Sequence, residues 1–219
     1  MHPWRLAARG SKDLYSQAHH DERPVRGFHR CVWHSHTVLH VYVDESARDE
    51  NGLCVVAAVV LDDDQAAAAR TELAAILPPG AKRLHWNSDS PVVRNQVSQV
   101  IQRQADHVSA YVSYYDSNKR MNDARERCLT HLIADVGGVP FKTVTLDQRS
   151  PHQDTRDRVL WSQQCVRLRL PNPPALSHAG SLSEPLLWLA DAAAGAIGEH
   201  LAHKDPTYVR VFASTLRIV

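Results

Sequence analysis

The chain lacks any apolar run as long as the roughly 18 to 20 residues that a membrane-spanning helix requires. Its first residues, Met1–Arg5, lead into a polar stretch, so the apolar segment of a secretory signal peptide is also missing. The cysteines form no C-x-x-C pair, a pattern typical of a reducing compartment and not of a disulfide framework. We therefore expect a cytoplasmic protein that binds no membrane, with its cysteines mostly buried as small hydrophobic residues.

An excess of charge of either sign is absent too. Lysine and arginine number 25 and aspartate and glutamate 24, which gives a formal net charge of +1. The protein as a whole therefore does not attract a polyanion, and any binding of nucleic acid depends on a local basic face. The length of 219 residues and the hydrophobic share of 43% are ordinary for one soluble globular domain.

Several motifs of known enzyme classes are missing as well. The chain has no G-x-S-x-G elbow, no G-x-x-x-x-G-K-[ST] phosphate loop, no G-x-G-x-x-G fingerprint and no P-C-x-x-C partner for a deaminase zinc site. Residues 1–36 show no apolar period, which predicts a loosely ordered, histidine-rich extension before a single domain at 37–219. The spacing of His29–His36 matches no zinc module, so we expect no metal site there.

Apolar periodicity predicts the elements of that domain. The expected strands cover 38–44 (ending at Asp44–Ser46), 53–61, 107–115, 141–147 and, briefly, 175–179. The expected helices cover 65–77, 91–104, 122–135, 154–170 and a last helix from an N-cap at Ser183 to about His203. A polar turn at 48–52 makes the first two strands an antiparallel hairpin, and the whole order predicts a mixed α/β sheet covered by helices.

One carboxylate lies where a charge is unfavourable. Asp191 is the only charged residue in the apolar stretch Leu186–Ile197. An unpaired buried carboxylate costs several kcal/mol, so Asp191 needs a hydrogen bond, an ion pair or a cation. The alternative is that Glu184, Asp191 and Glu199, seven or eight residues apart, form a solvated stripe on one helical face.

Two of the expected strands also end in aspartate, at Asp44 and Asp147. Together with Asp191, these residues bring carboxylates from three distant segments to one edge of a sheet if the two strands are parallel neighbours. Mg²⁺ and Mn²⁺ prefer oxygen ligands, and a pair of such ions can cleave a phosphodiester bond. Capping offers a simpler explanation for each strand-end aspartate taken singly.

Four segments resemble a known family. The segments are Val41–Ser46, Leu84–Trp86, Leu146–Asp147 and Leu187–Gly195, and in this order they resemble the bacterial domain-of-unknown-function 3800 family. The resemblance covers about 39–201 and implies a ribonuclease H-like fold with the first strand central. It also implies that Asp44, Asp147 and Asp191 hold Mg²⁺ or Mn²⁺.

The resemblance further implies a fourth acid on an early helix, for which Glu72 is a candidate and the loop residue Asp89 a substitute. Glu45 faces away from Asp44 if the strand continues, because successive side chains alternate, so it is a secondary ligand or an ion-pair partner. His85 is a candidate for proton transfer, phosphate contact or metal binding, or a hydrogen-bonded structural residue.

Basic side chains near His85 supply the predicted phosphate contacts: Lys82, Arg83 and Arg94. The stretches Arg120–Arg127 and Arg156–Arg158 mix both signs of charge and are expected to be solvated helical faces. We therefore expect a divalent-metal-dependent phosphodiesterase, a nuclease acting on DNA or RNA. The alternatives are a non-catalytic scaffold of the same fold that binds nucleic acid or a protein partner, and a small-molecule phosphate hydrolase. The sequence predicts no oligomeric state.

Overall fold

The computed structural model describes residues 38–117, 120–213 and 216–218, and the predicted extension at 1–36 lies outside them. Within these described residues, six strands form one mixed sheet in the order β5-β4-β1-β2-β3-β6. The strands are β1 (Leu39–Arg48), β2 (Leu53–Asp62), β3 (His107–Tyr114), β4 (Phe141–Asp147), β5 (Ala175–Ala179) and β6 (Leu216–Ile218). The helices are α1 (Asp63–Ile76), α2 (Pro91–Gln104), α3 (Met121–Val136), α4 (Pro151–Arg167) and α5 (Leu187–His203).

The first strand is central, as the family resemblance implies. β1 pairs with β2 in the antiparallel sense and with β4 in the parallel sense. β3 is antiparallel to β2, β5 is parallel to β4, and the short β6, which the sequence did not predict, is parallel to β3. Every described strand except β2 therefore runs in the same direction, and the carboxyl ends of β1, β3, β4 and β5 meet at one edge.

The β1–β2 hairpin is longer than predicted. β1 continues past Asp44 to Arg48 because its backbone stays paired with β2 up to the pair Arg48 and Leu53. A short 3-10 turn then leads to Gly52, whose φ of 56° lies in the left-handed region. A Cβ atom at Gly52 would lie 2.0 Å from the carbonyl oxygen of Tyr115, so the hairpin requires glycine at this position.

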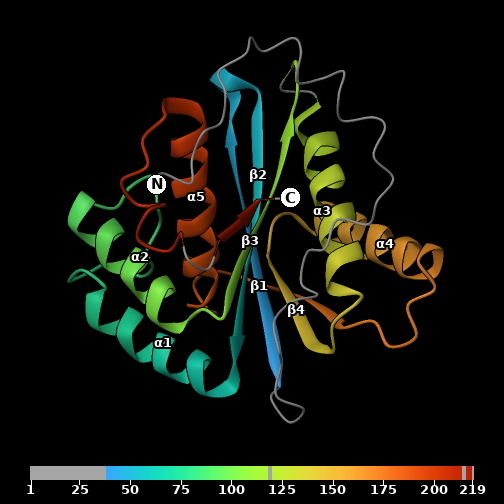
Figure 1. The fold of residues 1–219 in the computed structure, drawn as a ribbon, viewed down its shortest axis with the longest axis horizontal. Coiled ribbons are helices and arrows are strands. Elements are labelled where there is room, and N and C mark those ends of the chain that lie inside the picture. The colour runs from blue at the N-terminus through green and yellow to red at the C-terminus, as the bar shows by residue number, and fades with distance from the viewer. Residues whose placement is uncertain (1–37, 118–119, 214–215, 219) are drawn as a thin grey trace, which may run out of the picture.

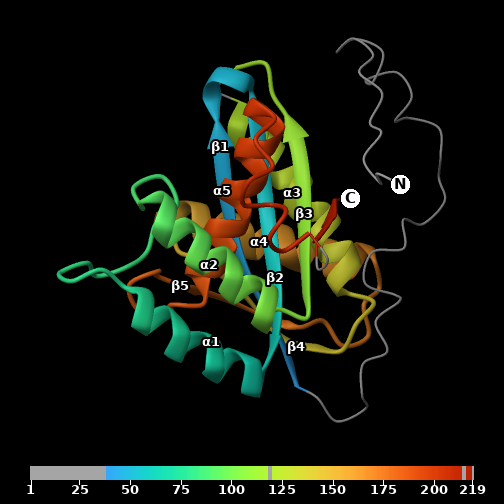
Figure 2. The ribbon, with the colours of Figure 1, turned by 60° about the vertical axis from the view of Figure 1, so that its left-hand side comes forward.

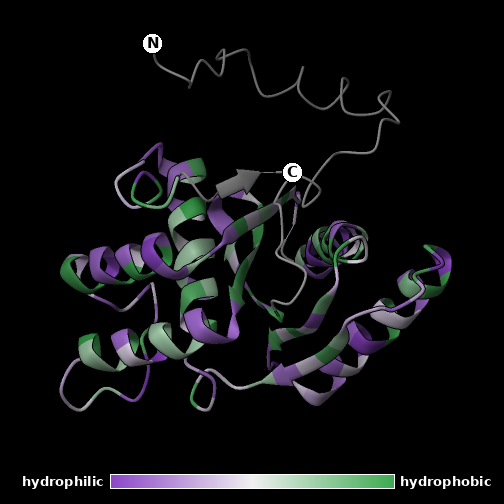
Figure 3. Ribbon diagram, turned by 60° about the horizontal axis from the view of Figure 1, so that its bottom comes forward, coloured by the Kyte–Doolittle hydropathy of each residue, from purple (hydrophilic) through white to green (hydrophobic). Residues whose placement is uncertain are grey.

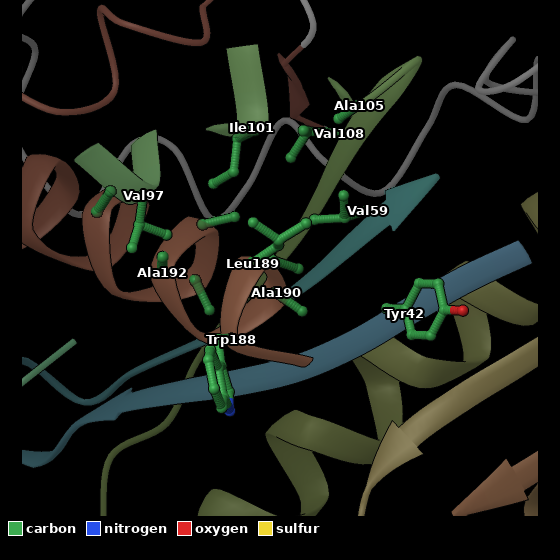
Figure 4. Close-up of a cluster of buried hydrophobic side chains, with 14 of the residues drawn as sticks. Tyr42, Val59, Val97, Ile101, Ala105, Val108, Trp188, Leu189, Ala190 and Ala192 are labelled. Carbon is green, nitrogen blue, oxygen red and sulfur yellow. The ribbon is translucent and has the colours of Figure 1, made fainter. Parts of the chain in front are cut away.

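Helices cover both faces of the sheet. Figure 1 shows α1, α2 and α5 on one side of the strands and α3 and α4 on the other. Every residue of β2 from Leu53 to Leu61 is buried, as its continuous apolar sequence predicts. In Figure 4, Val97 and Ile101 of α2 pack beside Val59 and α5 in one of the two apolar clusters.

The outer helices are amphipathic, and both hydropathy colours appear along them in Figure 3. Figure 2 shows α1 and α2 side by side, with α2 beside α5. α1 begins with a capping box in which Asp62 and Gln65 exchange hydrogen bonds of 2.8 Å. No described helix is both long and apolar enough to cross a membrane.

The start of α5 differs from the prediction. Ser183 does not cap the helix, which begins at Leu187 with Leu186 as its N-cap residue. The Ser183 hydroxyl instead donates to the carbonyl oxygen of Gly180 at 2.9 Å, within a turn that precedes the helix. The predicted first turn is therefore part of the connection from β5 to α5.

Gly195 packs so closely against Trp86 that a larger residue at this position should destabilise the protein. A Cβ atom at Gly195 would lie 2.3 Å from ring atoms of Trp86, and this ring is held by Arg94 and by an edge contact with Tyr208. We expect Gly195→Ala to lower the free energy of unfolding by about 1–3 kcal/mol through overpacking. Gly180→Ala is the control, because its Cβ would meet nothing closer than 3.8 Å. Equal chemical-denaturation midpoints for the two variants would contradict this packing.

Candidate acidic site at the sheet edge

Asp44 and Asp147 lie side by side, as predicted. The register pairs Val43 of β1 with Leu146 of β4, so the next residues on these parallel strands are neighbours. Adjacent strands are about 4.8 Å apart. Val43 and Leu146 face α3 and α4, and therefore both aspartates face α5.

The environment of Asp44 is strongly unfavourable for its negative charge. Burial and the charges of Glu45, Asp191 and Asp147, in that order, raise the pKa of Asp44 well above its usual value. Its Oδ1 accepts one hydrogen bond, 2.7 Å long, from the backbone N–H of Glu45, and this bond opposes the rise. Mutual repulsion of this kind is expected where several carboxylates share a site without a cation.

Asp147 has an oxygen atom without a partner. Its Oδ1 is buried, and no described group donates a hydrogen bond to it. Burial, the Glu45 charge and the Asp191 charge raise the pKa of Asp147, whereas a backbone hydrogen bond from Ser181 and the charge of Arg83 lower it. A buried carboxylate oxygen without a donor is costly unless a cation or water satisfies it.

Asp191 reaches the same edge from α5 and has the partners that its position requires. Its Oδ2 accepts a 2.7 Å hydrogen bond from the backbone N–H of Trp86 and lies 3.2 Å from Nδ1 of His85. The solvated-stripe alternative is wrong: Glu184 pairs with Arg70 at 2.9 Å, Glu199 with Arg94 at 2.9 Å, and the Asp191 side chain is only 16% exposed.

The loop between α1 and α2 brings His85 and Asp89 to the site. The hydrogen bond to Asp191 raises the pKa of His85, which favours a protonated, donating imidazole. Asp89 accepts a 2.9 Å hydrogen bond from the backbone N–H of His85, and burial and the Asp191 charge raise its pKa. Of the two candidates for a fourth acid, Asp89 is therefore the one near Asp191.

Glu72, the other candidate, points elsewhere. Its carboxylate pairs with Arg103 and accepts a hydrogen bond from Gln104, both at the end of α2. It is also not among the charges that perturb Asp44 or Asp147.

Glu45 is an ion-pair partner, as the alternation of strand side chains predicts. It faces α3, where Arg125 Nε lies 3.1 Å and Arg149 Nε 3.5 Å from its carboxylate oxygens. Arg125 also donates twice to Asp157 of α4, at 2.5 and 3.0 Å. A buried network therefore lies behind the strand that carries Asp44.

The prediction of solvated helical faces is wrong for Arg125 and for Asp157. Arg125, within Arg120–Arg127, is 3% exposed, and Asp157, within Arg156–Arg158, is 5% exposed. The other charges of these stretches behave as predicted where the structure describes them: Arg156 and Glu126 are half exposed and 3.5 Å apart.

Asp157 also belongs to a second group that the sequence did not single out. Among the described residues, Asp154, Asp157 and His178 are the group whose candidate ligand atoms all lie within 4.8 Å of one another. The three predicted acids do not form so compact a group. Asp157 is already occupied, because both of its oxygens accept hydrogen bonds from Arg125.

Of the predicted phosphate contacts, Arg83 is the one whose charge acts on a strand aspartate. It is exposed, it donates a 2.7 Å hydrogen bond to the Ser181 hydroxyl, and its charge lowers the pKa of Asp147. Lys82 is also exposed. Arg94 is held by Glu199 and lies over the Trp86 ring, 5.0 Å from its centre.

The donor set fits a hard divalent cation. Three carboxylates from β1, β4 and α5 face the same edge, the charge of Asp191 raises the pKa values of both strand aspartates, and one oxygen of Asp147 is buried without a donor. Carboxylate oxygens are the ligands that Mg²⁺ and Mn²⁺ prefer. His85 and Arg83 add a proton donor and a permanent positive charge beside the carboxylates.

Comparison with known proteins shows no family for this chain. No protein-family model matches the chain, and no curated protein matches it. The chain is similar to the crystal structure of RNase H1 from the halophilic archaeon Halobacterium salinarum NRC-1, with a TM-score of 0.32, 12% identity, and coverage of 71% of this chain and 96% of that chain. The mixed sheet with helices on both faces makes the described chain an α/β domain, as predicted. The resemblance to the domain-of-unknown-function 3800 family stays a prediction from motifs.

Proposed function

We propose that this protein is a divalent-metal-dependent phosphodiesterase, a nuclease acting on DNA or RNA. Asp44, Asp147 and Asp191 would hold Mg²⁺ or Mn²⁺ at the carboxyl end of β4 and beside the neighbouring part of β1. The observation that carries the proposal is the pairing of two parallel strands whose aspartates are neighbours and face an acid on α5. A bound ion of this kind polarises a phosphodiester and lowers the pKa of a water molecule.

The remaining residues of the site have separate roles in this proposal. His85, with its pKa raised by Asp191, donates a proton to the oxygen that leaves the phosphorus. Arg83 contacts a phosphate beside Asp147, and Lys82 and Arg94 contact phosphates further along the strand. Glu45 and Asp89 act indirectly, Glu45 through its charge on both strand aspartates and Asp89 by fixing the backbone of His85.

A non-catalytic scaffold is the second candidate, and one observation favours it. Asp191 already accepts hydrogen bonds from the loop residues His85 and Trp86, so it serves as an anchor for this loop without any ion. In such a scaffold the acids only hold loops in place, and nucleic acid or a protein partner binds without being cleaved.

A cleavage assay separates these candidates. Single-stranded, duplex and hybrid substrates are incubated with Mn²⁺ and either the parent protein, Asp147→Asn or Asp106→Asn, the last as an acid outside the site that accepts from Gln65. We expect cleavage by the parent and by Asp106→Asn, and a loss of about a hundredfold or more in Asp147→Asn because an ion ligand is gone. Retained substrate binding without cleavage by the parent would favour the scaffold.

A further inference from the structure

Positive charge occupies the α3 side of the acidic edge. No acid of α3 is among the charges that perturb Asp44 or Asp147. The helix instead sends Arg125 to Glu45, and the connection after β4 sends Arg149 to the same carboxylate. The charges that α3 and this connection bring to the back of the acidic edge are thus two guanidinium groups.

The summed charge of the groups around the strand aspartates indicates that the site needs few ions. The charged groups that the structure places at this edge, together with the ion-pair network of Glu45 behind it, are six carboxylates, three guanidinium groups and the protonated imidazole of His85, which leaves a formal charge of −2. The charged groups are Asp44, Glu45, Asp89, Asp147, Asp157, Asp191, Arg83, Arg125, Arg149 and His85. One divalent ion neutralises this charge, and a second ion would leave an excess of positive charge in a half-buried site.

The two arginines at Glu45 differ in how firmly they are held. Arg125 makes two short hydrogen bonds to Asp157 and is almost fully buried. Arg149 makes only long contacts, 3.5 Å to Glu45 and 3.9 Å to Asp157, and its buried Nε has no hydrogen-bond partner. It also follows Asp147 by two residues and lines a cavity of about 20 Å³, the size of one water molecule.

We infer that the acidic edge binds a single divalent ion, and that Arg149 supplies the second positive charge that the substrate phosphate meets. This inference rests on the proposed nuclease function. Asp44, Asp147 and Asp191 hold the ion from the α5 face, and the loosely held guanidinium of Arg149 turns from Glu45 to the phosphate. Arg125 stays on Glu45 and Asp157, so Glu45 does not become a ligand of another ion. The group around Asp157 takes no ion either, because Arg125 uses both of its oxygens.

Equilibrium dialysis with Mn²⁺ alone tests the number of ions directly. We expect one Mn²⁺ bound per parent chain and none per chain of Asp147→Asn. Arg149→Met should still bind one ion, roughly three- to tenfold more tightly, because a neighbouring positive charge is gone. Cleavage by Arg149→Met should fall by about a hundredfold, with partial recovery in Arg149→Lys. Arg103→Met, which removes the same charge at the Glu72 pair, should match the parent in both measurements.

The outcomes distinguish this inference from the function on which it rests. Two ions bound per parent chain would overturn the single-ion site and leave the nuclease proposal intact. Unchanged Mn²⁺ affinity and unchanged cleavage in Arg149→Met would overturn the role of Arg149. An absence of Mn²⁺ binding by the folded parent chain would overturn the metal-dependent function itself, and the inference with it.

Discussion

Asp44→Asn is expected to raise the melting temperature of the metal-free protein at pH 7 and to abolish its stabilisation by Mn²⁺. The substitution removes one of several repelling half-buried carboxylates and keeps an oxygen that accepts from the Glu45 N–H. In the parent, Mn²⁺ at about a hundred times its dissociation constant adds about 2.7 kcal/mol, or roughly 5–10 °C. Differential scanning fluorimetry with and without Mn²⁺ measures both effects.

The dependence on pH provides the control for this prediction. The pKa of Asp44 is higher in the folded protein than in the unfolded chain, so its ionisation costs folding free energy above the unfolded pKa of about 4. The stability difference between Asp44→Asn and the parent should therefore be largest near neutral pH and shrink as the pH falls towards 4. A difference that stays constant with pH, or a variant that melts below the metal-free parent, would show that Asp44 is not under electrostatic strain.

Arg125→Met should destabilise the protein by about 3–5 kcal/mol, which is about 10 °C or more in melting temperature. The reason is that Glu45 and Asp157 would lose the guanidinium that neutralises both of them in the interior. Arg103→Met is the matched control, because its pair with Glu72 is largely exposed and is worth less than about 1 kcal/mol.

A double variant shows whether the stability lost in Arg125→Met comes from the buried carboxylate that is left without its partner. Arg125→Met combined with Asp157→Leu removes a buried acid together with its partner, and it should recover part of the stability that Arg125→Met loses. Urea denaturation of the parent, both single variants and the double variant measures the coupling. Strictly additive losses would mean that Arg125 and Asp157 contribute through packing alone.

Most of the fold was predictable because its elements follow local rules. The helix at 91–104 and the strand at 141–147 were predicted with the observed bounds, since Ser90 and Pro91 begin the helix and β-branched residues fill the strand. The errors in the predicted bounds lie where residues distant in sequence determine the end of a strand or the start of a helix. β1 runs past Asp44 because β2 offers pairing partners, and α5 starts late because Ser183 bonds to Gly180 instead of the helix.

The acids of the site were predictable from their positions, and the network behind them was not. Strand ends and an isolated charge in an apolar helix led to Asp44, Asp147 and Asp191, and the structure places all three at one edge. Arg125 was misjudged because its neighbours in sequence carry mixed charges. Its spacing of three and four residues from the buried Cys128 and Leu129 was the available signal that it faces the interior.

The unequal lengths of β1 and β4 make the sheet edge stepped. β4 ends at Asp147, whereas β1 continues for four residues beyond Asp44, or about 13 Å, with β2 paired along its whole length. Figure 1 shows this hairpin rising past β4, and α5 supports it through the contact between Glu199 and Arg48 at 3.7 Å. The acids therefore lie at the foot of a wall that the hairpin forms on the β2 side. If the proposed nuclease function holds, this wall blocks a long, stiff ligand from the β2 side, so the lengths of two strands restrict its direction of approach.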